Sequence, residues 1–244
     1  MNGLTGAERI ARGSRAVTLA GLAVLSLLSW LYLLSGAEMA PMAGMAGMAM
    51  SPGWPLVVAM WWTMMIAMMV PSAAPTILLY AKVHRHSHES APPTAAFLAG
   101  YLTCWFVVSL FAAWLQIAVT SPMSMAIDSP MASGTLLIAA GLYQLSPLKD
   151  ACLGRCRSPA QFLTRYYRPG LWGAVRLGLL HGAYCVGCCW LLMALLFVVG
   201  VMNLLWVAAL TLLVAAEKLL PGGLWIARIS GAGLILWGMA ILVA

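Results

Sequence analysis

Charged side chains are scarce in this sequence. Only 8% of the 244 residues are Asp, Glu, Lys or Arg, whereas 63% are hydrophobic. A soluble globular domain carries roughly 25% charged residues, because its surface faces water. The scarcity excludes a soluble protein. It predicts instead an all-α fold, a polytopic bundle of membrane-spanning helices connected by short loops.

Motifs for nucleotide binding and hydrolysis are also missing. The sequence has no Gly-rich phosphate loop, no nucleophile elbow and no paired carboxylates for acid–base catalysis. We therefore expect neither an enzyme nor a transport ATPase. Nucleic-acid binding is not expected either, because the net charge of +7 is not gathered into a basic stripe between aromatic residues.

Long apolar stretches predict where the chain crosses the membrane. There are seven, at residues 17–34, 55–81, 95–119, 132–147, 171–199, 203–219 and 225–243. The first could also be a cleaved signal peptide. Its apolar run is longer than the roughly 7 to 15 residues of such a segment, which favours a retained anchor.

Basic residues give an independent test of the span count, because cytoplasmic loops are enriched in Lys and Arg. With seven spans and a cytoplasmic N-terminus, all 13 Lys and Arg residues fall in inner loops or at inner helix ends. We therefore predict that the N-terminus is inside and the C-terminus outside.

The second span contains two prolines, Pro71 and Pro75. Each removes a backbone hydrogen bond and frees a carbonyl, so a kink or a short break is expected. Irregular backbone at membrane depth is tolerated only where protein or a cavity surrounds it. This predicts a place for the helix in the bundle interior, although the motif could also be a simple packing kink.

Methionine is concentrated in the outer connections and in the second span. The first outer connection contains Met39, Met42, Met45, Met48 and Met50, and the second contains Met123, Met125 and Met131. In the span, Met60, Met64 and Met68 recur every four residues, with Met65 and Met69 beside them. Thioethers are soft ligands that suit Cu(I). Two alternatives explain the loop methionines: they are a drift of composition in a low-complexity segment, or the loop lies on the membrane surface. The alternative for the helix is that its methionines fill gaps in the packed core.

The fifth span carries four metal-ligand side chains in nine residues, His181, Cys185, Cys188 and Cys189. Helical geometry places the first three within about 60° of one face, with Cys189 at its margin. Such a set suits Cu(I) or Zn(II). Cysteine is often buried as a small apolar residue, so inert packing is the alternative reading.

Polar residues with possible metal or redox roles also occur on the predicted inner side. Cys152 and Cys156 share a face if their segment is helical, and the adjacent arginines are expected to lower their thiol pKa values. Glu217 and Lys218 form either a proton-linked pair or an interfacial ion pair. His84, His86 and His88 alternate in a hydrophilic stretch that is either a metal site or a solvated loop.

Four segments together resemble a bacterial family of predicted metal-binding integral membrane proteins, a domain of unknown function. They read AMMVPSAAP, LYQLSPLKDACLGRCRSP, HGAYCVGCCWLLMALLFVVGVMNLLWVAAL and EKLLPGG. The resemblance covers roughly residue 54 to the end and implies a multi-pass protein of the bacterial inner membrane that binds metal. The matching positions are Met68, Met69, Pro71, Cys152, Cys156, His181, Cys185, Cys188, Cys189, Glu217 and Lys218.

These patterns favour a protein that binds a soft metal ion, Cu(I) first and zinc second, and transports or delivers it. The expected organisation is an anchor helix with a Met-rich outer loop at 1–53 and a six-helix metal-binding domain at 54–244. The expected partners are the lipid bilayer, the metal ion and a metallochaperone or membrane complex. The alternatives are a thiol redox or assembly subunit, in which the cysteines exchange electrons with a partner, and a purely structural subunit.

Overall fold

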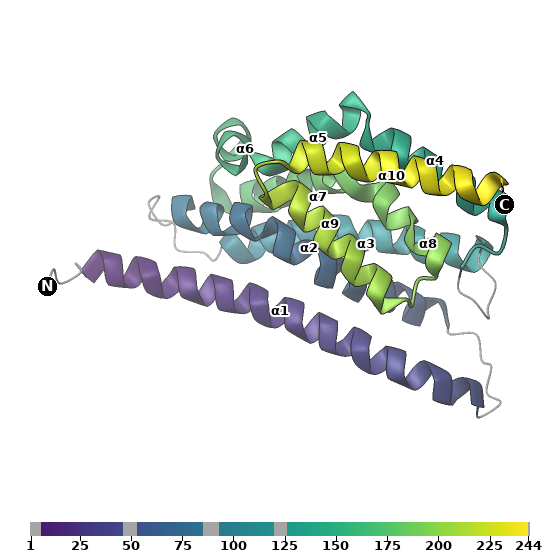
Figure 1. The fold of residues 1–244 in the computed structure, drawn as a ribbon. Coiled ribbons are helices and arrows are strands. Elements are labelled where there is room, and N and C mark those ends of the chain that lie inside the picture. Colours follow the sequence, from purple (N-terminus) through teal and green to yellow (C-terminus); the bar gives the residue numbers. More distant parts are fainter. Residues whose placement is uncertain (1–5, 46–52, 85–92, 120–125, 244) are drawn as a thin grey trace, which may run out of the picture.

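A computed structural model describes residues 6–45, 53–84, 93–119 and 126–243, and in this part of the chain all regular structure is α-helical. Figure 1 shows the arrangement. The helices are α1 (Gly6–Met45), α2 (Trp54–His84), α3 (Pro93–Val119), α4 (Pro130–Gln144), α5 (Pro147–Arg157), α6 (Pro159–Tyr166), α7 (Gly170–Ala194), α8 (Leu196–Val199), α9 (Leu204–Leu219) and α10 (Gly223–Val243).

Five of these helices are long and apolar enough to cross a membrane. They coincide with five of the seven predicted spans and comprise Ala16–Gly36, Trp54–Val83, Thr94–Val119, Gly170–Val199 and Gly223–Val243. The other two predicted spans form the shorter helices α4 and α9, of 15 and 16 residues. At 1.5 Å per residue they reach only about 22 to 24 Å, less than the roughly 30 Å of a hydrocarbon core. The fold is consistent with a membrane protein, and five spans are supported by length.

Residues 35–45 do not form the expected loop, because α1 continues to Met45. Six of these 11 residues are alanine or methionine, which are strong helix formers, and the helix continues despite Gly36, Pro41 and Gly44. The side chains of Met39, Met42 and Met45 lie outside the described part of the structure, as do residues 48 and 50.

The core of the molecule is built around α2. In its most apolar stretch of 18 residues, 67% is buried, compared with 22% in the corresponding stretches of α1 and α10. Its interior position confirms the expectation from the two prolines. The helix is continuous through Pro71 and Pro75, so no break is present. Pro71 leaves the carbonyl of Ala67 without its helical donor, and the Ser26 hydroxyl of α1 donates to this carbonyl at 3.5 Å.

Glycines set the closest helix crossings. A Cβ at Gly178 of α7 would clash with the backbone of Phe97 in α3, and one at Gly100 of α3 would clash with Val175 in α7. Small residues at such positions let two backbones approach closely. The order of the contacts shows that α3 and α7 run parallel. Between α4 and α10, Gly134 faces Gly238 and Gly141 faces Gly231, so this pair runs antiparallel (Figure 1).

Candidate metal centre

Helix α7 carries all four residues of the predicted cluster on its buried side. The exposed fraction is 3% for His181 and 1% for each of Cys185, Cys188 and Cys189. The Gly178 crossing with α3 brings Tyr101 against this face, with its ring 5.7 Å from that of His181. The three thiols are therefore enclosed by protein, without contact with lipid or water.

The thiols point toward one another within a single helical turn. The Sγ atoms of Cys188 and Cys189 lie 3.1 Å and 3.0 Å from the carbonyl oxygen of Cys185, to which both donate. All three are free cysteines. The arrangement therefore offers three unbonded sulfur atoms in one small volume.

A buried lysine approaches the cluster from α9. The Nζ of Lys218 lies 2.9 Å from the Sγ of Cys185 and 3.2 Å from the Ser72 hydroxyl of α2. The Tyr101 hydroxyl lies 3.2 Å from the same sulfur and donates to the carbonyl of Met69. Cys185 is thus held by polar groups from two other helices, which inert apolar packing would not provide.

A methionine sulfur reaches the cluster from α2. The Sδ of Met69 lies 3.9 Å from the Sγ of Cys189. The methionine stripe predicted from the sequence was centred on Met60, Met64 and Met68, whereas the contact that the structure describes comes from Met69, beside Met68. Met64 and Met68 are buried and Met60 is partly buried, which packing alone would also produce.

The imidazole of His181 lies among the aromatic rings of Phe97, Tyr101 and Phe162, at centroid distances of 5.2 to 6.0 Å. Its Nδ1 atom is buried and has no hydrogen-bond partner among the described residues. Buried polar atoms in native proteins are nearly always paired, because an unpaired one costs free energy. A metal ion would supply the missing partner.

Helix α5 adds two more cysteines beside α7. The neighbouring Cys188 thiol, together with burial, raises the pKa of the Cys156 thiol. Burial also raises the pKa of Cys152, whose sulfur lies against Gly187, despite the opposing effect of Arg155. The expectation of lowered thiol pKa values was wrong, because desolvation and neighbouring thiols outweigh the arginines. The helical segment and the shared face of the two residues are confirmed.

Glu217 does not pair with Lys218. Its carboxylate lies 2.6 Å from the Nζ of Lys149 and accepts from the Gln144 amide at 2.7 Å. Gln144 also contacts Lys149 and donates to Ser230 at 2.8 Å. This buried network ties α4, α5, α9 and α10 together. The two alternatives proposed from the sequence for a Glu217–Lys218 pair are therefore wrong, because the adjacent side chains point to different partners.

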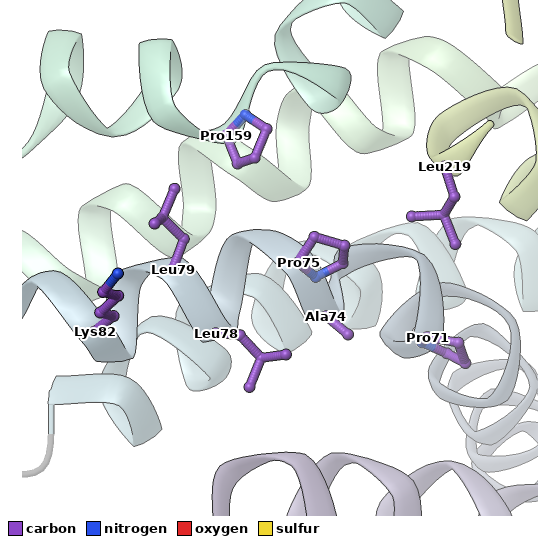
Figure 2. A pocket seen from close by; sticks show the side chains of 8 residues that line it. All are labelled: Pro71, Ala74, Pro75, Leu78, Leu79, Lys82, Pro159 and Leu219. Atoms are coloured by element: carbon purple, nitrogen blue, oxygen red, sulfur yellow. The ribbon is translucent and has the colours of Figure 1, made fainter. Parts of the chain in front are cut away.

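A groove of about 600 Å³ runs along α2 between α6 and α9. Figure 2 shows Lys82 at one end, Pro71 and Leu219 at the other, and Pro159 of α6 across from α2. Seven of its eight lining residues are apolar. Pro71 and Leu219 adjoin Ser72 and Lys218 in the sequence, but neither Ser72 nor Lys218 lines the groove.

Thiols and a thioether are soft donors, the kind of ligand that suits Cu(I). Within the described residues, no group of three or more His, Cys, Asp or Glu side chains is already arranged around one metal position. Cu(I) is satisfied by two or three soft ligands, including thioethers. The three thiols and the Met69 thioether are donors of this kind.

Some residues expected to bind metal cannot be placed at the cluster. Met48, Met50, His86, His88, Met123 and Met125 lie outside the described residues, as does the side chain of His84. Met131 is described, and its side chain is exposed at the start of α4.

A family model, PpoB2, described as a copper chaperone, matches residues 58–241. The chain belongs to this family. The match covers well over half of the sequence and includes α2 through most of α10, and thus every residue of the cluster. No curated protein and no solved structure matches the chain. Membership in the copper-chaperone family confirms the expected metal-related family in general terms.

Three features of the site were missed in the sequence. Tyr101 lies in an apolar stretch without any metal-binding motif, and Lys218 was assigned to the wrong partner. Cys104 of α3 is half-buried and faces Gly182 of α7. A lone polar residue in a predicted span is itself a signal of function, so Lys218 could have been recognised on that ground.

Proposed function

We propose that this protein spans the bacterial inner membrane seven times, binds one Cu(I) ion at the α7 cluster and delivers it to a partner protein. The ligands are two of the three thiols of Cys185, Cys188 and Cys189, the Met69 thioether and, in one state, the His181 imidazole. Copper is the cargo of the protein and takes no part in a catalysed reaction.

One observation carries this proposal. Three free thiols of α7 and a thioether of α2 lie together in the buried interior, and His181, one helical turn before Cys185, has a buried Nδ1 atom without a hydrogen-bond partner among the described residues. Core packing requires none of these polar groups, and burying an unpaired nitrogen opposes folding. The description of the family as a copper chaperone agrees with this donor set.

The seven-span topology has support in the helix directions. Alternating crossings require the third and fifth spans, α3 and α7, to be parallel and the fourth and seventh, α4 and α10, to be antiparallel. Both relationships are found at the glycine contacts. In this topology α4 and α9 cross the bilayer as short helices flanked by α5 and α8.

Metal analysis of full-length protein, purified in detergent under reducing conditions, tests the proposal. We expect about one Cu(I) per chain and six free thiols after the copper is removed. Reversible loss of two thiols without bound copper would favour the alternative, a thiol redox subunit, and would contradict copper delivery. The contact between Cys156 and Cys188 makes this pair the one to examine for such a disulfide.

A further inference from the structure

The groove along α2 has the length of one membrane leaflet. Pro71 and Lys82, which line its two ends, are 11 positions apart on α2. At 1.5 Å per residue they are separated by about 16 Å along the helix axis, roughly half of the 30 Å of a hydrocarbon core. Six of the eight lining residues lie on this one face of α2, at spacings of one, three and four residues: Pro71, Ala74, Pro75, Leu78, Leu79 and Lys82. The groove therefore matches a lipid tail in extent and direction.

Three helices form the walls of the groove. Pro159 of α6 and Leu219 of α9 lie across from the α2 face (Figure 2). Three of the eight lining residues are prolines, whose rigid rings fix much of the shape before a ligand binds. An acyl chain in this groove touches protein on several sides, and gains more van der Waals contacts than a lipid lying against the convex surface of a helix.

The polar end of the groove is formed by Lys82. Its side chain is exposed, and among the described residues no carboxylate pairs with it. In the proposed topology, this is the cytoplasmic end of the second span, at the level of the inner-leaflet headgroups. Basic pockets between membrane helices on the cytoplasmic side bind the headgroups of anionic lipids. The groove thus offers a cation at the headgroup level and an apolar surface below it.

We propose that this groove binds one anionic phospholipid of the inner leaflet, with an acyl chain along α2 and the phosphate at Lys82. The inference goes beyond copper delivery and rests only on the proposed topology. A ligand that contacts α2, α6 and α9 together binds the folded arrangement of these helices, so it stabilises the protein by mass action. A neutral lipid does not complement the lysine, and a soluble phosphate does not fill the apolar groove.

Lipid binding to the full-length protein, depleted of lipid in a neutral detergent, tests this site. The probes are phosphatidylglycerol and phosphatidylcholine with identical acyl chains, and the measurements are native mass spectrometry and thermal unfolding. We expect phosphatidylglycerol to bind about fivefold more tightly, the factor that one lysine near an anionic headgroup contributes. It should also raise the unfolding midpoint more than phosphatidylcholine does.

Two variants separate the headgroup contact from the groove. Lys82→Gln should abolish the preference for phosphatidylglycerol. Arg165→Gln is the matched control and should keep the preference, because it removes an exposed positive charge of α6 outside the groove. Ala74→Phe, which places a ring in the groove, should weaken the binding of both lipids.

A Lys82→Gln protein that keeps the wild-type preference would overturn the inference, and this variant decides alone if Ala74→Phe does not fold. Glycerol 3-phosphate that raises the unfolding midpoint as much as phosphatidylglycerol would also overturn it, because the chain would then contribute nothing. Lipid-depleted protein that forms dimers and binds neither lipid would show that a second copy covers the groove. Copper content is measured on the same samples, so a failure of lipid binding is distinguishable from a failure of copper binding.

Discussion

The Sδ of Met69 lies 3.9 Å from the Sγ of Cys189, which joins α2 and α7 through two soft sulfur atoms. Both side chains are fully buried. This contact places a thioether of a second helix beside the three thiols of α7, and under the proposed function it predicts different roles for Met69 and its neighbour Met68.

Met69→Leu should lower Cu(I) affinity by roughly tenfold, or about 1.4 kcal/mol, because it removes one soft ligand. Leucine is close to methionine in volume, so the fold should be retained. Met68→Leu is the matched control, since Met68 is equally buried and the same change of volume is made. Affinity is measured by competition with a chromophoric Cu(I) chelator. Equal affinities for the two variants would argue against Met69 as a ligand.

Gly178→Ala should lower the free energy of unfolding by roughly 1 to 3 kcal/mol, because the added Cβ would clash with the Phe97 backbone and push α3 away from α7. Gly233→Ala, with open space around its Cβ on α10, serves as the control and should leave stability unchanged or slightly raised. Thermal unfolding in detergent provides the measurement. A stable Gly178→Ala protein with unchanged Cu(I) affinity would show that this crossing does not position the cluster.

Glu217→Ala should cost roughly 3 to 5 kcal/mol of stability, because it leaves the Lys149 ammonium buried without its carboxylate. Replacing both partners, as in Glu217→Leu with Lys149→Met, should recover much of this loss, since no unpaired charge remains. Thermal unfolding of the two proteins in the same detergent tests the comparison. Equal stability of the single and double variants would contradict a buried ion pair.

Reporter fusions test the span count. A reporter that works only outside the cytoplasm should be active when fused at Ala244, because seven crossings from a cytoplasmic N-terminus end on the outer side. A fusion after Arg168, between α6 and α7, should be active only on the cytoplasmic side. A C-terminal reporter active in the cytoplasm would show that α4 or α9 does not cross the membrane.

The sequence was sufficient to predict the long apolar helices and the common buried face of the α7 residues, because both depend on local periodicity. Apolar runs locate α2, α3, α7 and α10, and spacings of three and four residues place His181, Cys185 and Cys188 on one face. The C-terminal end of α4 was less predictable. The apolar stretch predicted at 132–147 continues past it, because Ser146 and Pro147 already begin α5.

Contacts between helices could not be predicted in this way. Adjacent residues on a helix point about 100° apart, so the rotation of α2 decides whether Met68 or Met69 faces Cys189. The same geometry separates Glu217 from Lys218. Their partners, Lys149 and Cys185, lie 68 and 33 residues away in the chain. Such pairings depend on how the helices cross, which hydrophobic periodicity does not determine.

The Cu(I) content of a Cys185→Ser, Cys188→Ser double variant tests the central claim most directly. Cys104→Ser, which changes a half-buried thiol on α3, is the matched control. After identical loading with Cu(I) and removal of free metal, we expect about one copper per chain in the wild type and in the control, and almost none in the double variant. A double variant that keeps wild-type copper content and affinity would show that the α7 thiols are ordinary packing and that copper binds elsewhere.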